Sequence, residues 1–160
     1  MTAKAAVNPV AAAFRFLAIR SHGISELKAK LKRKGFDDDA VISAVNHLIE
    51  IDAVNDERFA FEFAASRLRN KNWGPRKVAA ELAARGVSQE IIGRVAGGVT
   101  HEREAELVKE ALTKWFKKTA CSTPLDRKAF AKAVRHLTGR GFGLDVTLDA
   151  LRRLGDDEAS

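Results

Sequence analysis

The sequence predicts an all-α protein made of three tandem three-helix repeats. Three observations support this fold class. Apolar residues recur at the three- and four-residue spacing of helices along the whole chain. Alternating strand-like runs are absent, and the chain contains no Tyr. Glycine turns of one pattern stand at nearly regular intervals, which is typical of a repeat protein.

The repeat is visible in three turns in which a basic residue precedes glycine and an apolar residue follows it. The glycines are Gly35, Gly86 and Gly141, about 51 and 55 residues apart. A helix often ends at a residue with positive φ, which glycine adopts without a clash at Cβ. We therefore expect each glycine to end one helix of a three-helix unit.

The same pattern predicts the domain boundaries. We expect a flexible N-terminus over residues 1–9, repeats over residues 10–53, 54–99 and 100–154, and a flexible acidic tail over residues 155–160. Helix starts are expected where a capping residue or a proline stands, at Asp37 or Asp38, Asn55, Pro75, Ser88 and Pro124.

Apolar stripes predict the core. They comprise Val41, Val45, Leu48 and Ile49, then Val108, Leu112 and Trp115, then Phe130, Val134 and Leu137, and finally Leu144, Leu148 and Leu151. The helix near residues 57–69 is apolar over more than half of its circumference, through Phe59, Ala60, Phe61, Phe63, Ala64, Ala65 and Leu68. We expect it to be buried on most sides. Arg67 falls on its apolar side, where it must snorkel or reach a partner.

No catalytic or metal-binding pattern is visible in the sequence. The four histidines, His22, His47, His101 and His136, lie in separate segments and form no HxxxH or HExxH pair. The sequence also lacks a phosphate-binding glycine loop and a nucleophile elbow. We therefore predict that the protein is not an enzyme and uses neither a cofactor nor a metal ion.

Charge and composition indicate the environment of the chain. A formal net charge of +7 favours polyanions or acidic protein surfaces. The single cysteine, Cys121, fits a reducing compartment. No apolar run approaches the ~20 residues that span a bilayer, and we recognise no signal peptide. We expect a cytoplasmic protein without membrane contact, and a monomer, because no coiled-coil seam is present.

Basic side chains form the candidate binding site. We select eight of them, in the first and second repeats: Lys28, Lys32, Arg33, Arg67, Arg69, Lys71, Arg76 and Lys77. Arginine forks onto carboxylates or phosphates. No helix carries a base-reading set of Asn, Gln and Arg, so DNA binding should be weak and independent of sequence. The alternative is a solvated face that only keeps the protein soluble.

The middle of the chain resembles the signature of the RecX family of regulatory proteins. The matching segments read NDERFA at residues 55–60, SRLR at 66–69, WGPRKV at 73–78 and RGV at 85–87. The first repeat fits through LAIR at 17–20, SEL at 25–27 and KGF at 34–36, and the third through RGF at 140–142. The match runs from about Ala11 to Leu154, and Asn72 stands where the family commonly has Gly.

This resemblance implies repeats similar to helix-turn-helix variants in an elongated, curved array. It also implies a protein that binds the RecA recombinase and its filament on single-stranded DNA, with weak non-specific DNA binding. Inhibition of ATP hydrolysis and strand exchange would modulate recombination, DNA repair and the SOS response. The matched Arg67, Arg76 and Lys77 are then the best candidates for filament contact. A DNA-binding module that acts without RecA, or an adaptor for another acidic protein, remains open.

Overall fold

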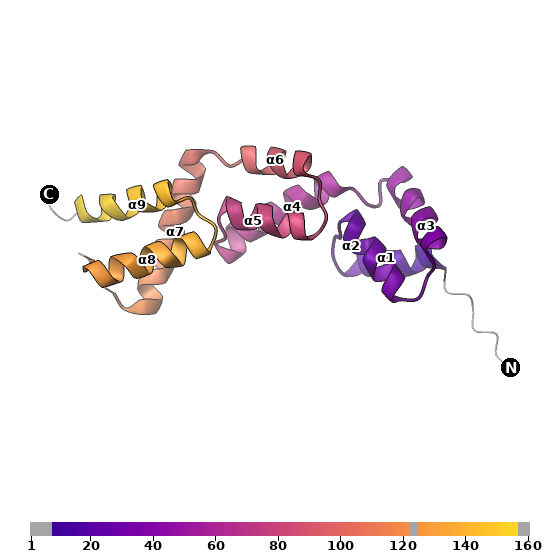
Figure 1. Ribbon diagram of the computed structural model, residues 1–160, viewed down its shortest axis with the longest axis horizontal. Coiled ribbons are helices and arrows are strands. Elements are labelled where there is room, and N and C mark those ends of the chain that lie inside the picture. Colours follow the sequence, from indigo (N-terminus) through magenta and orange to yellow (C-terminus); the bar gives the residue numbers. More distant parts are fainter. Residues whose placement is uncertain (1–7, 122–124, 157–160) are drawn as a thin grey trace. The chain divides into compact units, whose positions relative to one another are not determined.

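The computed structural model describes residues 8–121 and 125–156, and the regular secondary structure in these ranges is exclusively helical. These ranges contain nine α-helices in three successive triplets (Figure 1). The triplets comprise α1 (Pro9–Ile19), α2 (Ile24–Arg33) and α3 (Asp38–Glu50); α4 (Asp56–Lys71), α5 (Pro75–Ala84) and α6 (Gln89–Gly97); and α7 (His101–Thr119), α8 (Arg127–Gly139) and α9 (Leu144–Asp156). The predicted all-α class with three tandem three-helix repeats is confirmed. Residues 1–7 and 157–160, in the predicted N-terminal segment and acidic tail, lie outside the described ranges.

The triplets are distributed over two compact units. One contains the residues up to Glu62 together with Leu82–Ile92, and the other contains Phe63–Glu81 together with the residues from Gly93 onward. The first triplet therefore lies in one unit and the third triplet in the other, whereas the helices of the second triplet contribute to both. No described helix is both long and apolar enough to cross a bilayer.

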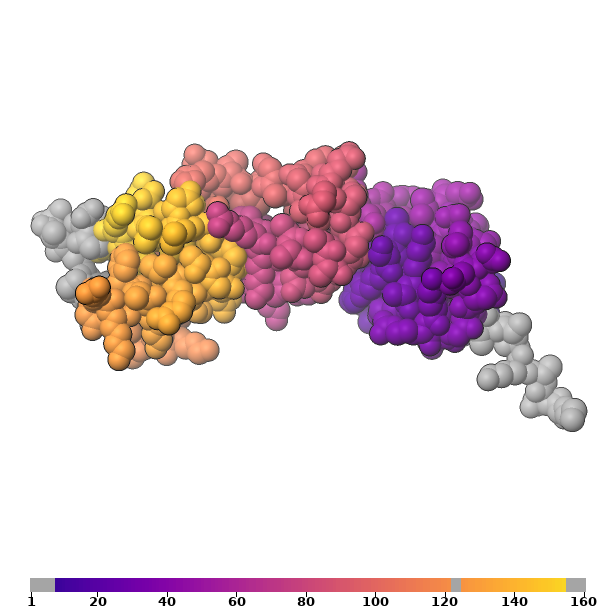
Figure 2. All heavy atoms as spheres, in the orientation of Figure 1, coloured from indigo at the N-terminus to yellow at the C-terminus, as the bar shows by residue number. Residues whose placement is uncertain are grey.

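The first triplet closes around its own core. Each of its helices packs on the other two, and their atoms lie together in the space-filling view (Figure 2). The largest buried side chains of this core are Leu27, Leu31, Val41, Val45 and Leu48. They lie at i, i+4 and i+7 positions of α2 and α3, so the amphipathic spacing of these helices determines the face that they bury.

The third triplet has a larger core. Its helices α7, α8 and α9 pack pairwise around Leu107, Leu112, Trp115, Leu137 and Phe142, each at most 4% exposed. Leu68 of α4 packs against the edge of this core. The end of α4 is thereby attached to the third triplet by apolar contact.

The three glycine turns share one hydrogen-bonding pattern. Gly35, Gly86 and Gly141 have φ values of 94°, 76° and 89°, as predicted for residues that follow a helix end. In each turn the glycine N–H and the next N–H bond back to the last helical turn, and the second of these bonds reaches Leu31, Leu82 or Leu137. This is a Schellman ending. The three leucines are fully buried, so each turn is also held by the core.

Two of these glycines also meet the start of another helix. A Cβ on Gly141 would lie 2.3 Å from the backbone nitrogen of Lys77, and a Cβ on Gly86 would lie 2.6 Å from the side chain of Ser25. Gly74 completes the first of these contacts, because a Cβ there would lie 2.3 Å from the Gly141 backbone. The close approach requires glycine for reasons of space in addition to φ. Gly35 has nothing within 4 Å of the same position.

Most of the predicted helix starts are confirmed. The side chains of Asp37, Asn55 and Ser88 each accept a hydrogen bond from the backbone N–H three residues later in the chain, at 2.8, 3.0 and 3.4 Å respectively. Pro75 is the first residue of α5. Pro124 lies outside the described residues, and α8 begins only at Arg127, after an N-cap at Asp126 whose carboxylate accepts from the Ala129 N–H at 2.6 Å.

Two predicted core positions are wrong. Ile49 and Leu144 are 41% and 50% exposed, because each stands beside the buried stripe of its helix rather than in it. The expectation that α4 is enclosed on most sides also fails. Phe61 is 44% exposed, and Ala65, one turn later, is exposed as well. Only the side of α4 that carries Phe59, Ala60 and Ala64 is buried.

The glycine contacts predict unequal costs for one substitution made in two turns. Gly35→Ala should cost only the strain of positive φ, about 1–2 kcal/mol. Gly141→Ala should cost at least about 2 kcal/mol more, because its Cβ overlaps the backbone of Lys77. Urea unfolding of the two variants measures both costs. Equal losses would show that the contact with α5 is not close in solution.

Candidate functional site

The eight predicted site residues lie in both compact units. Lys28, Lys32 and Arg33 are on α2, in the unit that contains the first triplet. The other five lie in the last turns of α4 and the first turn of α5, in the unit that contains the third triplet. The two groups are therefore considered as two separate surfaces.

An aromatic–cation stack organises the group on α4 and α5. The guanidinium carbon of Arg67 lies 4.8 Å from the ring centroid of Phe63 and 5.5 Å from that of Trp73. The ammonium of Lys77 lies 4.6 Å from the Trp73 centroid. Two cations thus contact one indole, whose ring meets Phe63 edge to face at 6.5 Å. The predicted contact of Arg67 on the apolar side of its helix is an aromatic one.

Arg67 is held more firmly than a surface arginine. Its Nε is buried and has no hydrogen-bond partner within the described residues. A buried donor without a partner costs about 1–3 kcal/mol, and the ring contacts offset part of this cost. A fixed guanidinium loses little freedom when it binds a carboxylate or a phosphate, so Arg67 is preorganised for such a ligand.

The turn between α4 and α5 is clamped by the third triplet. Arg140 donates to the carbonyl of Lys71 at 2.6 Å, and its own carbonyl accepts from the Gly74 N–H at 2.7 Å. Lys114 donates to the side chain of Asn72 at 2.9 Å. Asn72 adopts φ 49°, a left-handed conformation that Asn tolerates better than most residues. The sequence gives no indication of Arg140 and Lys114 as clamping residues, because both are far from this turn along the chain.

The cations around the clamped turn are free to bind. Arg69, Lys71 and Arg76 are exposed, and no described carboxylate lies within 4 Å of them. Arg69 makes only a long contact of 3.4 Å from Nε to the carbonyl of Ala65. Lys77 is half-buried, with its ammonium over the Trp73 ring, whereas Arg76 is exposed. We call Arg67, Arg69, Lys71, Arg76 and Lys77 the α4–α5 cationic surface.

The group on α2 is less available. Lys32 pairs with Asp38 at 2.8 Å, and Lys28 is half-buried, whereas Arg33 is exposed. The neighbouring Lys30 and Lys34 lie 5.0 and 5.8 Å from the ring of Phe16. Part of the positive charge of this helix is therefore already engaged within the protein.

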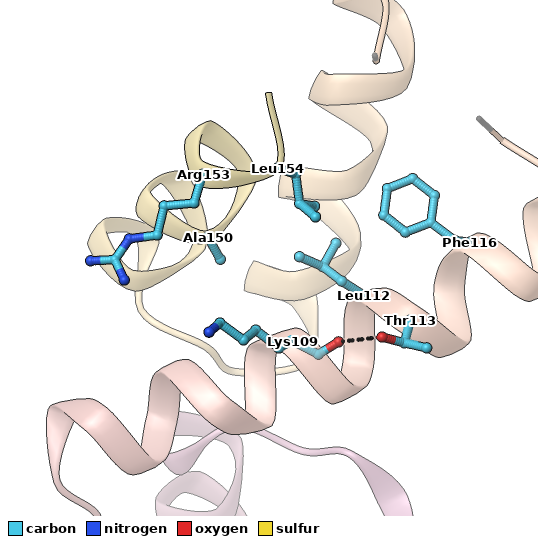
Figure 3. A pocket seen from close by; sticks show the side chains of 7 residues that line it. All are labelled: Lys109, Leu112, Thr113, Phe116, Ala150, Arg153 and Leu154. Atoms are coloured by element: carbon cyan, nitrogen blue, oxygen red, sulfur yellow. Dashed lines mark hydrogen bonds between the residues drawn. The ribbon is translucent and has the colours of Figure 1, made fainter. Parts of the chain in front are cut away.

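A hollow of about 500 Å³ lies between α7 and α9 (Figure 3). Its floor is apolar, through Leu112, Phe116 and Leu154, and Lys109 and Arg153 stand at its edge. The hydroxyl of Thr113, another lining residue, donates to the Lys109 carbonyl at 2.9 Å and is thereby engaged in its own helix. The lining offers no paired nucleophile and base for catalysis.

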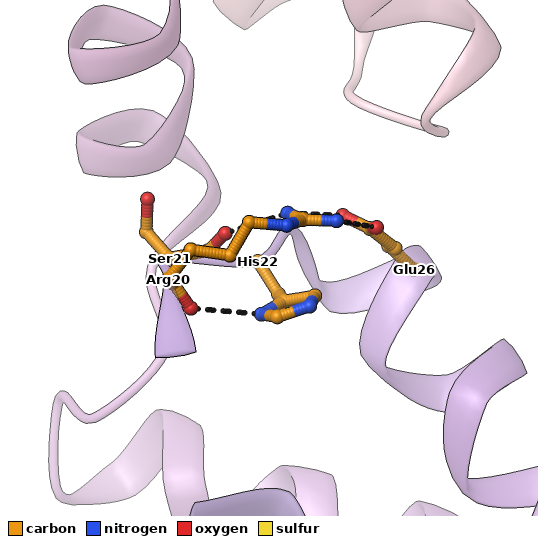
Figure 4. A network of polar contacts seen from close by, with 4 residues as sticks. All are labelled: Arg20, Ser21, His22 and Glu26. Carbon is orange, nitrogen blue, oxygen red and sulfur yellow. Dashed lines mark hydrogen bonds and ion pairs between the residues drawn. The ribbon is translucent and has the colours of Figure 1, made fainter. Parts of the chain in front are cut away.

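The buried polar network near the start of α2 has a structural role. His22 is 3% exposed, and its Nδ1 lies 2.9 Å from the carbonyl of Arg20, which in turn pairs with Glu26 (Figure 4). Burial, followed by the charge of Arg20, lowers the pKa of His22 below its ordinary 6.5. Burial raises the pKa of Glu26, but its hydrogen bond and charge pairing with Arg20 outweigh this and lower it. No group of three His, Cys, Asp or Glu able to hold a metal ion occurs within the described residues.

The fold and the site together define a tandem three-helix-repeat protein with cationic surfaces. Two family models match the chain, described as the first three-helix domain of RecX at residues 11–48 and the second at residues 55–95. The regulatory protein RecX of Chlorobaculum tepidum is 32% identical over 148 residues, covering 92% of this chain and 89% of that protein. The regulatory protein RecX of Ectopseudomonas mendocina is 31% identical, covering 94% and 98%. This chain belongs to the RecX family of regulatory proteins.

Solved structures agree with the fold. The crystal structure of RecX from Lactobacillus salivarius superposes with a TM-score of 0.78 at 20% sequence identity, covering 91% of this chain and 94% of that chain. The family resemblance noted from the sequence motifs is confirmed.

The exposure of α4 predicts different costs for two phenylalanine truncations on one helix. Phe63→Ala should cost roughly 2 kcal/mol, less than the ~3–5 of a fully buried Phe, because Phe63 is half-buried against Arg67 and Trp73. Phe61→Ala should cost under about 1 kcal/mol, because this ring is 44% exposed. Denaturant unfolding measures both costs. A cost for Phe61→Ala equal to that for Phe63→Ala would mean that α4 is enclosed after all.

The low pKa of His22 predicts a loss of stability in acid. The unfolded chain protonates this residue near pH 6.5 and the folded chain only at lower pH, so its contribution is complete above 6.5 and is lost as the pH falls. The free energy of unfolding should therefore fall as the pH drops below about 6.5, and it should fall less steeply in His22→Gln. An equal drop in the variant would assign the effect to other groups.

Proposed function

We propose that this chain is a non-enzymatic, cytoplasmic regulator that binds the RecA recombinase and its filament on DNA and inhibits ATP hydrolysis and strand exchange. One observation carries the proposal. The motif at residues 73–78 that matches the family signature contributes Trp73, Arg76 and Lys77 to the α4–α5 cationic surface and its aromatic stack. The names of the relatives support a regulatory role, and the resemblance supplies RecA as its target.

The mechanism requires only binding. A filament on DNA presents phosphates and acidic side chains along a continuous groove, to which exposed cations are electrostatically complementary. Arg69, Lys71 and Arg76 supply unpaired charge, while the stack fixes the direction of Arg67 and Lys77. Many dispersed contacts accumulate affinity without a catalytic site. A protein bound in the groove then obstructs the addition of subunits or the turnover of nucleotide.

A DNA-binding module that acts without RecA is the second candidate. The unpaired cations of the α4–α5 cationic surface favour it, because they suit any polyanion. The two candidates differ in their dependence on the recombinase. A filament regulator binds the RecA–DNA complex much more tightly than bare DNA of the same length.

The proposed function predicts the effect of reversing two charges. Added to RecA on single-stranded DNA, the wild-type chain should depress ATP hydrolysis. Arg69→Glu combined with Arg76→Glu should require at least about tenfold more protein for the same inhibition, equivalent to ~1.4 kcal/mol of binding. Both side chains are exposed, so the variant should fold normally.

The matched control is Lys109→Glu combined with Arg153→Glu, which changes the net charge equally at the hollow between α7 and α9. It should inhibit nearly as well as wild type. Equal losses in the two variants would mean that only total charge matters. Absence of inhibition by the wild-type chain at equimolar concentration would remove the RecA proposal itself.

A further inference from the structure

A third cationic surface lies on the third triplet, apart from the groups on α2 and on α4–α5. A shallow hollow of about 520 Å³ is lined by Trp115 of α7 and by four residues of α8, Lys128, Lys132, Arg135 and His136. Among its described lining residues none is acidic. We call Lys128, Lys132 and Arg135 the α8 basic row.

The row lies on one face of the helix. Its members are separated by four and three residues, the spacing at which side chains on a helix are neighbours. At a rise of 1.5 Å per residue the row extends over about 10 Å. All three side chains are exposed, and within the described residues none has a carboxylate partner within 4 Å.

Further positive charge surrounds His136 beside the row. Nε of Arg140 donates to Nε2 of His136 at 3.2 Å, so this ring nitrogen acts as an acceptor. Burial, followed by the charges of Arg140 and Lys118, lowers the pKa of His136. Lys118 of α7 and Arg140, which directly follows α8, therefore add positive charge beside the row.

Such an arrangement is unfavourable in the free protein. Like charges on adjacent turns of a helix destabilise it by a few tenths of a kcal/mol per pair, and nothing described here compensates them. A ligand with several regularly spaced negative charges would relieve the repulsion. The row thus selects a polyanion over a single small anion.

We propose that the α8 basic row is a docking site for the phosphodiester backbone of nucleic acid. In double-stranded DNA each strand carries one charge per ~3.4 Å of helix axis, so a row of about 10 Å can meet two or three phosphates. An acidic protein partner would instead need an apolar anchor at the centre of its interface. The Trp115 ring on the floor of the hollow is 4% exposed and provides neither an anchor nor a platform for base stacking. Contact through the backbone alone makes the binding independent of base sequence.

This inference rests on the proposed function only in that the DNA bound in the cell would be the DNA of the recombinase filament. It assigns the DNA contact to α8 and leaves the α4–α5 cationic surface for the filament as a whole. The binding itself requires no recombinase, so a test on bare DNA fails or succeeds independently of the ATP hydrolysis assay.

The test measures the affinity of the full chain for a fluorescent oligothymidylate of about 20 nucleotides over a series of salt concentrations. Lys132→Gln combined with Arg135→Gln removes two phosphate contacts. The slope of log K against log salt should become shallower by about 1.4, at ~0.7 per phosphate for single strands. Affinity at low salt should fall about tenfold.

Lys109→Gln combined with Arg153→Gln is the control, with the same loss of charge in the same unit. These residues also line a hollow that contains Glu102, Glu106 and Asp149, whose charges repel phosphate. The control slope should stay within about 0.3 of wild type. Equal changes in both variants would overturn the assignment to α8. Displacement of the oligonucleotide by polyglutamate at equal charge concentration would overturn it in favour of an acidic protein.

A readout on the wild-type chain needs no substitution. Phosphates docked on the row lie beside His136 and stabilise its protonated form. NMR titration should therefore show its pKa rising when the oligothymidylate is added, while the pKa of His22 in the other unit stays constant. An unchanged pKa of His136 at saturation would place the DNA elsewhere.

Discussion

The contact on which this architecture depends is the meeting of a glycine turn with the start of another helix. The turn at Gly141 meets the first turn of α5, and the turn at Gly86 meets the first turn of α2. Each glycine satisfies two requirements at once, a positive φ that completes a Schellman ending and the absence of a Cβ where the turn closely approaches the next helix. The contact joins segments of successive triplets within each unit.

The functional surface depends on the same contact. The backbone N–H groups of Gly74 and Arg76 donate to the carbonyls of Arg140 and Gly141 respectively. The turn that carries the cations is therefore supported by the turn after α8. Trp73 lies in this supported segment and contacts both Arg67 and Lys77. A rigid aromatic side chain on a clamped turn therefore positions two charges that would otherwise move freely. Such preorganisation reduces the entropy lost on binding.

Local chemistry explains what could be predicted from the sequence. The spacing of Leu31, Gly35 and Phe36, repeated in the other two turns, is a short-range signal that identifies a helix end without any tertiary information. The partners of the turns at Gly86 and Gly141 lie far along the chain and could not be predicted from local patterns. Arg140, which precedes Gly141, bonds to the Lys71 carbonyl across 69 residues. Burial was overestimated where apolar residues surround a helix, as at Phe61, because the sequence does not reveal on which side of the helix a neighbour packs.

The candidate site, too, could be predicted only in part. The family motifs in the sequence single out Arg67, Arg76 and Lys77, but they do not reveal that Arg67 and Lys77 contact Trp73 whereas Arg76 is exposed. The sequence also gives no reason to prefer α8 as a binding surface, because a row of basic residues on a helix can equally be a solvated face. Only the common hollow and the neighbouring Arg140 and Lys118 distinguish this row.

Hydrogen–deuterium exchange of the chain, alone and with a RecA filament on single-stranded DNA, tests the central claim most directly. Amides of the α4–α5 turn and of α8 should exchange more slowly in the presence of the filament, while those of α3 should not change. Protection confined to the first triplet, or no protection anywhere, would contradict the account.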